Sequence, residues 1–355
     1  IQISSLIGIY AFNTIVITVF SVPSILYLNR KKNDLLGFFL IIILSIASYI
    51  YGNFKISAFK NLEIQKLSAE IKILSTNISI ERFYSNLDEE EILNKLIDLS
   101  NPNQQENTIY IWPEGVIPNI NLVSLKNDYK YLFKKSFSKN HKIILGLNDD
   151  NFKNDEQIFY NSLSILDNEA NVIHKYYKNK LVPFGEFLPL ENILSKIGLK
   201  TLTNNYQSYS SSDERKFFNL NQNNDIKILP LICYEIIYSG KLSKNNNFNF
   251  IVNISEDGWF GNSIGPYQHF AHSIFRSVEY GKYTFRSANN GISAVVDPTG
   301  SIIDKLGVNK EGIISIKEIS NVEPTLFSTF GNKIYFLIIL LYIFLIFSFK
   351  KMENE

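Results

Sequence analysis

Apolar runs near both ends of the chain bracket a region of ordinary globular composition and constrain the fold more than any other feature. They cover residues 6–28, 35–51 and 334–349. A helix needs about 20 mostly apolar residues to cross the hydrocarbon core of a bilayer, whereas buried core helices suit runs of about 10–14 residues. We therefore expect two transmembrane helices within 1–60, a soluble domain at 61–325, and a C-terminal transmembrane helix with a short cytoplasmic tail within 326–355.

Basic residues beside these runs predict how the chain is oriented. The short link 29–34 and residues 350–351 after the last run are rich in lysine and arginine, which favours the cytoplasmic side. The middle domain is then expected on the opposite face of the membrane, although lysines also flank it on that face. The first run lacks the basic leading region and the cleavage site of a signal peptide.

Charge and cysteine content exclude several classes of function. The chain has 35 Lys plus Arg against 34 Asp plus Glu, so no polyanion site is indicated and no nucleic acid is expected. Its one cysteine rules out an intrachain disulfide and a cysteine-cluster metal site. Phosphate-loop and His-Glu-x-x-His motifs do not occur. We expect no cofactor and no metal, and chemistry through the thiol.

Strand-like and helix-like patterns alternate in the middle region and predict a mixed α/β domain. Strands are expected at 70–78, 108–112, 141–147, 162–166, 172–176, 226–232 and 249–254, helices at 88–99 and 266–280, and a closing hairpin at 291–303. The Ser- and Asn-rich stretch 201–224 is too long for an ordinary connection. It fits either a lid over a site or a solvated surface loop.

Cys233 ends one of the expected buried strands and is followed by Tyr234 and Glu235. At such a strand-to-helix elbow, backbone N–H groups and a helix N-terminus would lower the pKa of the thiol and make it nucleophilic. The alternative is an inert buried cysteine, which is the commoner use of a lone thiol.

A thiol nucleophile needs a base for its proton and a donor for the oxyanion that follows. Glu114 leaves the strand 108–112 through Trp112 and Pro113, an aromatic step that we expect to shield the carboxylate; an exposed glutamate beside a turn is the alternative. Lys178 follows the strand 172–176 and would supply the cation. Spacing alone does not choose between this lysine and its neighbours, Lys175 and Lys180.

Further polar residues near these segments are candidates for supporting roles. Glu186 and Glu235 could orient the lysine and the backbone around the nucleophile, or could form structural ion pairs. His269 and His272 are three residues apart on an expected helix, a spacing that could suit a metal, but no third ligand stands out. We interpret them as structural or substrate-side residues.

At these residues the chain resembles the nitrilase, or carbon-nitrogen hydrolase, superfamily, and within it the membrane acyltransferases of bacterial lipoprotein maturation. The motifs are 177–186, Cys233-Tyr234-Glu235 and 257–263. The resemblance implies an α/β fold, a nitrilase-like α-β-β-α sandwich flanked by transmembrane α-helices. It also implies that Glu114 is the base, Lys178 the oxyanion stabiliser and Cys233 the nucleophile, with Glu186, Tyr234 and Glu235 in support.

The same resemblance implies a reaction and a location. A phospholipid donates an acyl chain to the cysteine as a thioester, and the chain passes to the α-amino group of a diacylglyceryl-cysteine at the N-terminus of an apolipoprotein. The enzyme would be a multi-pass protein of the bacterial inner membrane, with its catalytic domain facing the periplasm. A membrane-tethered amidase that hydrolyses a small amide with the same residues, and a catalytically silent membrane scaffold, are the alternatives.

This chain departs from the pattern of the superfamily's acyltransferases at a few places. They carry more membrane helices before the catalytic domain, and the chain starts at Ile1, not at methionine, so we expect an N-terminally truncated sequence. Lys180 stands where many relatives have histidine, and Phe83-Tyr84 fall where a tryptophan is usual.

Overall fold

The computed structural model describes residues 1–28, 32–85, 88–153, 156–190, 193, 196, 208–221, 223, 225–240, 242–243 and 246–354. Part of the basic link 29–34 and much of the stretch 201–224 lie outside the described residues. The predictions of membrane orientation and of a lid therefore stay predictions.

Two sheets form the centre of the domain between the apolar helices of the two ends, and in the described residues each has six strands. The first runs β12-β1-β2-β3-β4-β5, with β1 (Ile64–Ser75), β2 (Thr108–Ile111), β3 (His141–Lys153), β4 (Glu156–Leu166), β5 (Val172–Tyr177) and β12 (Gly312–Ser320). The second runs β11-β10-β9-β8-β7-β6, with β6 (Phe218–Asn219), β7 (Lys227–Ile232), β8 (Phe250–Glu256), β9 (Tyr283–Asn289), β10 (Ser293–Val296) and β11 (Ile302–Leu306). In each sheet three central strands are parallel, β1-β2-β3 and β7-β8-β9, and the remaining pairs are antiparallel.

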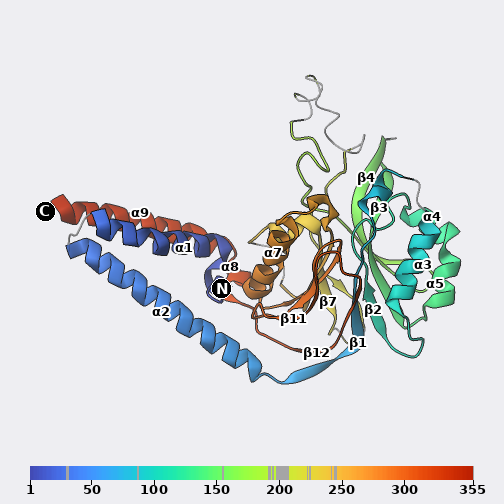
Figure 1. Ribbon diagram of the computed structural model, residues 1–355, viewed down its shortest axis with the longest axis horizontal. Coiled ribbons are helices and arrows are strands. Elements are labelled where there is room, and N and C mark those ends of the chain that lie inside the picture. The colour runs from blue at the N-terminus through green and yellow to red at the C-terminus, as the bar shows by residue number, and fades with distance from the viewer. Residues whose placement is uncertain are drawn as a thin grey trace.

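Helices cover the outer faces of the sheets and make an α-β-β-α sandwich (Figure 1). The helices α3 (Glu89–Ser100), α4 (Leu122–Asp128) and α5 (Lys130–Ser136) lie on the first sheet, and α7 (Gly265–Tyr280) lies on the second. Apolar side chains from both sheets, such as Ile111 and Ile254, fill the space between them. The predicted fold class is confirmed.

The local sequence explains the helix α3. Asp88 caps it, because its carboxylate accepts hydrogen bonds from the N–H groups of Glu90 and Glu91 at 2.9 and 3.3 Å. Ile92, Leu93, Leu96 and Ile97 share one face of the helix and are buried against the first sheet. This is the helix predicted at 88–99.

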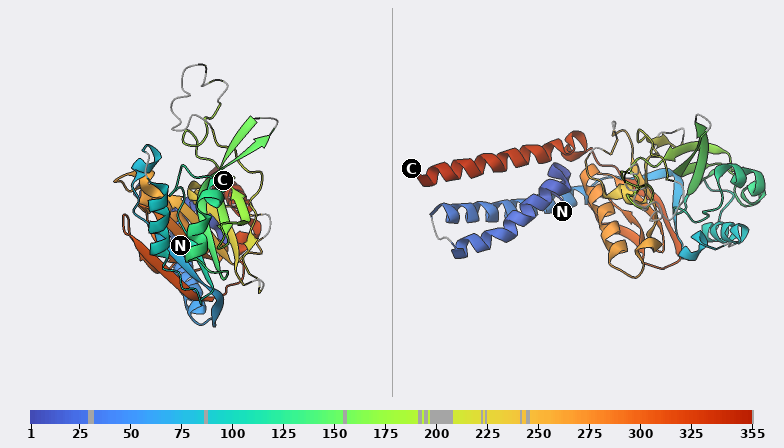
Figure 2. Two further views of the ribbon diagram at one scale, coloured as in Figure 1. Left: turned by 90° about the vertical axis from the view of Figure 1, so that its right-hand side faces the viewer. Right: turned by 90° about the horizontal axis from the view of Figure 1, so that it is seen from above.

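Three helices project together from the α7 side of the domain (Figures 1 and 2). They are α1 (Ser4–Leu28), α2 (Lys32–Lys60) and α9 (Lys333–Asn354), and the short α8 (Leu326–Phe330) precedes the last of them. Two apolar helices, Ser4–Ser24 and Leu35–Lys60, are long enough to cross a membrane, whereas the apolar part of α9, Lys333–Ser348, is shorter. By length and composition the described residues thus support two of the three expected spans.

The helix α1 is not continuous, in contrast to the uninterrupted run expected at 6–28. Gly8 has φ 76° and ψ 168°, and the ring of Phe327 occupies the space where a β-carbon would lie. A side chain is therefore excluded at this break. Beyond it the Thr18 hydroxyl lies 2.9 Å from that of Tyr342 on α9, which ties the two helices together.

Sequence patterns did not predict α4, α5, β6, β9 or β12. All seven residues of β9 are buried, yet Thr284, Arg286, Ser287 and Asn289 are polar, so the strand shows no apolar run and its alternation stops after Arg286. The polar side chains are accommodated because they hydrogen-bond within the domain, as Arg286 does to Asp257.

Candidate active site

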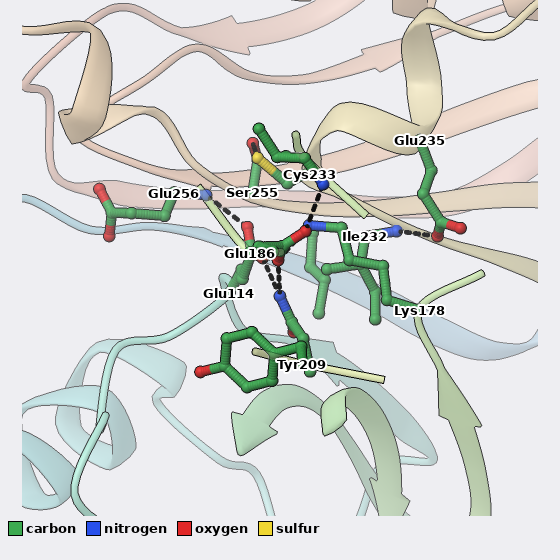
Figure 3. Close-up of polar contacts among 12 residues, drawn as sticks. Glu114, Lys178, Glu186, Tyr209, Ile232, Cys233, Glu235, Ser255 and Glu256 are labelled. Carbon is green, nitrogen blue, oxygen red and sulfur yellow. Dashed lines mark hydrogen bonds and ion pairs between the residues drawn. The ribbon is translucent and has the colours of Figure 1, made fainter. Parts of the chain in front are cut away.

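The ends of strands from both sheets bring three chemically active side chains together. Cys233 follows β7, Glu114 follows β2 and Lys178 follows β5. Ligand sites in α/β sheets occur at the carboxyl ends of parallel strands, and β2 and β7 are such strands. Figure 3 shows the three side chains converging on one region, with Ser255 and Glu186 next to them.

The backbone at Cys233 forms a sharp elbow. Cys233 has φ 47°, a left-handed conformation that costs energy for any residue other than glycine, and it opens the 3₁₀ helix η4 (Cys233–Ile237). The carbonyl oxygen of Cys233 lies 3.1 Å from Nε2 of His269, and the N–H of Ile232 donates to Glu235 at 2.9 Å. These contacts hold the strained turn in place from both sides.

The environment of the thiol differs from the predicted one. Burial, together with the negative charge of Glu114, raises the pKa of Cys233, although Lys178 acts to lower it. The expectation that a helix N-terminus lowers this pKa is wrong, because η4 is a five-residue 3₁₀ turn and desolvation is the larger effect. The thiol is therefore protonated at neutral pH, and attack on a substrate requires a base.

Lys178 is buried and lies between two carboxylates. Its Nζ donates to Oε1 of Glu186 at 2.8 Å and lies 3.5 Å from Oε1 of Glu114. Burial opposes its charge, but the carboxylates of Glu186 and Glu114 outweigh burial and raise the pKa of Lys178, so the ammonium group persists. Lys175 instead pairs with Asp149 at 2.6 Å, and Lys180 is exposed. Of these three lysines, Lys178 is thus the one that lies beside Glu114 and Glu186.

The carboxylate of Glu114 is nearly buried and both its oxygens have partners. Oε1 accepts from Nδ2 of Asn161 at 2.8 Å, and Oε2 accepts from the backbone N–H of Glu256 at 3.0 Å. A β-carbon at Gly146 would lie 2.7 Å from the α-carbon of Glu114, so β3 must carry glycine at this position beside Glu114. The carboxylate is held in one orientation next to the thiol and the ammonium.

Trp112 does not shield Glu114 as expected. Its ring lies on the helix side of the first sheet, where Nε1 donates to the Ser100 hydroxyl at 2.9 Å. The ring centroids of Trp112 and Phe133 are 6.0 Å apart. Side chains of successive strand residues point to opposite faces, so Ile111 packs between the sheets and Trp112 packs on the helix-covered face, while Glu114 lies beyond the end of β2.

The two supporting glutamates belong to separate networks, Glu186 partly buried and Glu235 fully buried. Glu186 accepts from Lys178, from Nδ2 of Asn161 at 2.8 Å and from the N–H of Val182 at 2.8 Å. Glu235 is fully buried and accepts from the Tyr176 hydroxyl at 2.8 Å and the Asn179 N–H at 2.9 Å. Since Glu235 also accepts from the Ile232 N–H, it links the lysine segment to the cysteine elbow.

The contact described for Tyr234 is with Tyr238 and not with Glu114, Lys178 or Cys233, the three residues of the candidate triad. The ring of Tyr234 packs edge-to-face on Tyr238, with the centroids 5.6 Å apart. Tyr234 stays a prediction as a site residue.

Sequence reasoning missed several residues around the triad. Asn161 lies within β4 and bridges Glu114 and Glu186, but no local motif marks it. The Ser255 hydroxyl lies 3.4 Å from the sulfur of Cys233 and 2.8 Å from Oδ1 of Asp257. Asp257 in turn accepts from Arg286 and lies 2.9 Å from Nδ1 of His269. His269 therefore belongs to a network that supports the cysteine elbow.

A metal role for His269 and His272 gains no support. Among the described residues no group of three or more His, Cys, Asp and Glu side chains is placed to hold an ion. Burial, reinforced by Arg276, lowers the pKa of His272 to about 4, so this ring is neutral at physiological pH.

The raised pKa of Cys233 predicts how thiol reactivity depends on pH. Below its pKa the thiolate fraction grows with pH, so the rate constant for alkylation by iodoacetamide should still rise above about pH 8.5, the usual thiol value. Mass spectrometry can measure this rate constant from the alkylated fraction, because Cys233 is the single cysteine of the chain. A plateau below about pH 8 would contradict the raised pKa.

Similarity to known proteins identifies the family of this chain. The family model for carbon-nitrogen hydrolases matches residues 77–323. This range contains all three converging side chains and every strand of the two sheets except β1, which ends at Ser75. The chain belongs to the carbon-nitrogen hydrolase family. The resemblance inferred from the motifs is thereby confirmed.

Curated relatives share a narrower name. Apolipoprotein N-acyltransferase from Bradyrhizobium diazoefficiens is 30% identical over 93% of this chain and 63% of its own length. Apolipoprotein N-acyltransferase from Rickettsia prowazekii is 40% identical over 69% of this chain and 49% of its own length. The chain thus spans about half to two-thirds of these relatives. Among solved structures, a mutant amidase of the nitrilase superfamily from Nesterenkonia AN1 matches 74% of this chain and 94% of its own, with 11% identity and a TM-score of 0.45.

Proposed function

We propose that this chain carries the catalytic activity of an apolipoprotein N-acyltransferase, moving an acyl chain from a phospholipid through Cys233 to the N-terminus of a lipoprotein. The observation that carries the proposal is the placement of Glu114 and Lys178 around a strained, protonated Cys233. The names of the curated relatives direct it toward lipoprotein acylation.

In the first step the sulfur of Cys233 attacks the carbonyl carbon of the donor's acyl ester, and Glu114 takes the thiol proton. The ammonium of Lys178 stabilises the tetrahedral oxyanion. When this intermediate collapses, the ester C–O bond breaks, and the lysophospholipid leaves as an alcohol with the proton held by Glu114. The product is a thioester on Cys233.

In the second step the α-amino group of the acceptor's diacylglyceryl-cysteine attacks the thioester. Glu114 takes a proton from the amine, the C–S bond breaks, and the thiol is restored as the proton passes to sulfur. An ester has become an amide by way of a thioester, so no nucleotide is consumed. The network of Asn161, Glu186 and Glu256 that holds the base and lysine serves both steps.

The helices beside the domain support a membrane setting. Large apolar side chains on α2, such as Phe39, Ile43 and Ile50, are more than half exposed, as expected of surfaces that face lipid. Because α1, α2 and α9 project from one side of the domain, they would hold it against a bilayer in which the acyl donor is concentrated. We place the protein in the bacterial inner membrane, with the domain on the periplasmic face.

Incubation with acyl-labelled phospholipid tests this function. The detergent-solubilised protein should gain one acyl group on Cys233 that hydroxylamine removes, and Cys233→Ala should gain none. Addition of a diacylated lipopeptide should then discharge the thioester and label the peptide's amino group.

Other outcomes would favour the alternatives. An amidase would leave the phospholipid intact and hydrolyse a small amide instead, with the same dependence on Cys233. A silent scaffold would do neither. Wild-type protein that gains no adduct from any phospholipid tested would end the acyltransferase proposal.

A further inference from the structure

A buried ion pair lies behind the base, outside the triad. Arg82, in the 3₁₀ helix η1 (Ile80–Phe83), and Glu256, at the end of β8, are each about 1% exposed. Nη2 of Arg82 donates to Oε2 of Glu256. Removing two charges from water costs free energy unless each finds close partners, so the neighbours of this pair show what it holds.

Arg82 binds the backbone beside the base. Its Nε donates to the carbonyl oxygen of Gly115 at 3.0 Å, and Gly115 directly follows Glu114. Its Nη1 donates to the carbonyl oxygens of Ile78 and Ser79 at 3.2 and 2.8 Å. The guanidinium group thus joins the segment before η1 to the strand end that carries Glu114.

Glu256 contacts the base from the other side. Its backbone N–H donates to Oε2 of Glu114, while its side chain runs away from the triad (Figure 3). The carboxylate of Glu256 is held by Arg82, by Nδ2 of Asn289 at 2.8 Å and by the N–H of Gly258 at 2.8 Å. The position of the N–H that orients the base therefore depends on where this carboxylate is anchored.

We propose that Arg82 and Glu256 are positioning residues for Glu114, forming a clamp that holds both its backbone and its carboxylate. The proposal rests on the proposed function in taking Glu114 as the base. The clamp reaches Glu114 through the carbonyl of Gly115 and through the N–H of Glu256. Of the contacts described for the two side chains, none is to Cys233 or Lys178.

The clamp matters because proton transfer is sensitive to small displacements. A shift of about 1 Å in a catalytic group can cost about 10²-fold in rate. Without the guanidinium group, Gly115 and Glu256 lose their common partner, and the carboxylate of Glu256 is left buried without its cation. We expect the Glu114 carboxylate to lose its orientation toward the thiol.

A double-mutant experiment separates positioning from general destabilisation. The readout is the rate constant for alkylation of Cys233 by iodoacetamide at pH 7, which needs no lipid and therefore works whether or not the phospholipid reaction occurs. The charge of Glu114 raises the pKa of Cys233, so its loss would by itself speed alkylation, and a fall in the rate constant therefore reports loss of the base. We expect Arg82→Met and Glu256→Gln each to lower it about tenfold in the wild-type background. In the Glu114→Gln background each should lower it less than about twofold, because the group they position is already lost.

Arg276→Met is the matched control. Arg276 is also fully buried and ion-paired, to Glu279 at 3.1 Å, but within α7 and away from the base. Any loss that it causes should be the same factor in both backgrounds. If Arg82→Met does not fold, by circular dichroism, Glu256→Gln decides, since it keeps the shape and the backbone N–H.

Three results would overturn the clamp. One is an equal fold-loss in both backgrounds, which would make the pair structural only. Another is an unchanged rate in both Arg82→Met and Glu256→Gln. The third is an unchanged rate in Glu114→Gln itself, which would leave nothing for the clamp to position.

Discussion

Replacement of Glu114 by glutamine should lower the rate of thioester formation by at least about 10²-fold, the usual scale for loss of a general base. Burial keeps the Cys233 thiol protonated, and an amide cannot take its proton. Glutamine matches the size of glutamate, and its amide oxygen can still accept from the N–H of Glu256. Its amide NH₂ would then face the donors of Asn161 and Lys178, so the variant should also lose stability, and the rate should be measured well below its melting temperature.

Single-turnover labelling with acyl-tagged phospholipid measures this effect. Glu318→Gln is a suitable control, because Glu318 lies on β12 at the edge of the first sheet and is exposed. It should react at the wild-type rate. A near-normal rate in Glu114→Gln would show that the proton goes elsewhere.

Replacement of Lys178 by methionine should also cost at least about 10²-fold in thioester formation, through loss of oxyanion stabilisation. A second effect adds to the first, because Lys178 lowers the pKa of Cys233 and its removal leaves less thiolate. The change also leaves Glu114 and Glu186 without their shared cation, and breaking a buried pair costs about 3–5 kcal/mol in the free energy of unfolding. The rate should be measured well below the melting temperature of the variant.

The pH dependence of the Lys178→Met rate separates its two effects. If the lysine acted only on the pKa of the thiol, raising the pH would restore the rate. If it stabilises the oxyanion, most of the loss should persist at high pH, and this is the result we expect. Lys175→Met is the control, because Lys175 pairs with Asp149 and not with the triad. A wild-type rate in Lys178→Met would remove the lysine from the mechanism.

Local patterns predicted a mixed α/β domain and most of its elements, whereas the sandwich architecture came from the family resemblance. The apolar face and acidic cap of α3, the buried runs of β7 and β8 and the turn between β10 and β11 all have short-range signals. The strand β9 was missed because its buried polar side chains find partners only in the folded domain. Composition does not distinguish such a strand from a loop.

Motifs likewise indicated the candidate triad but not its surroundings. Cys233, Glu114 and Lys178 each stand at a strand end within a distinctive string of residues. No local motif marks Asn161 or Arg82, although Asn161 donates to the carboxylate of Glu114 and Arg82 donates to the carbonyl oxygen of the next residue. The predicted pKa of Cys233 was wrong in direction, because the helix expected to lower it is a short 3₁₀ turn and burial dominates.

By itself the sequence determined the apolar runs, the strand order along the chain and the residue types available for chemistry, because hydrophobic periodicity and turn preferences act over a few residues. Only the tertiary structure decided which lysine lies beside the thiol, which face Trp112 occupies and which ion pair holds Glu114. Those outcomes depend on contacts between segments up to 174 residues apart, such as Arg82 with Glu256. Their energies come from burial and from charges meeting in a dry interior, which exist only once the sheets have packed.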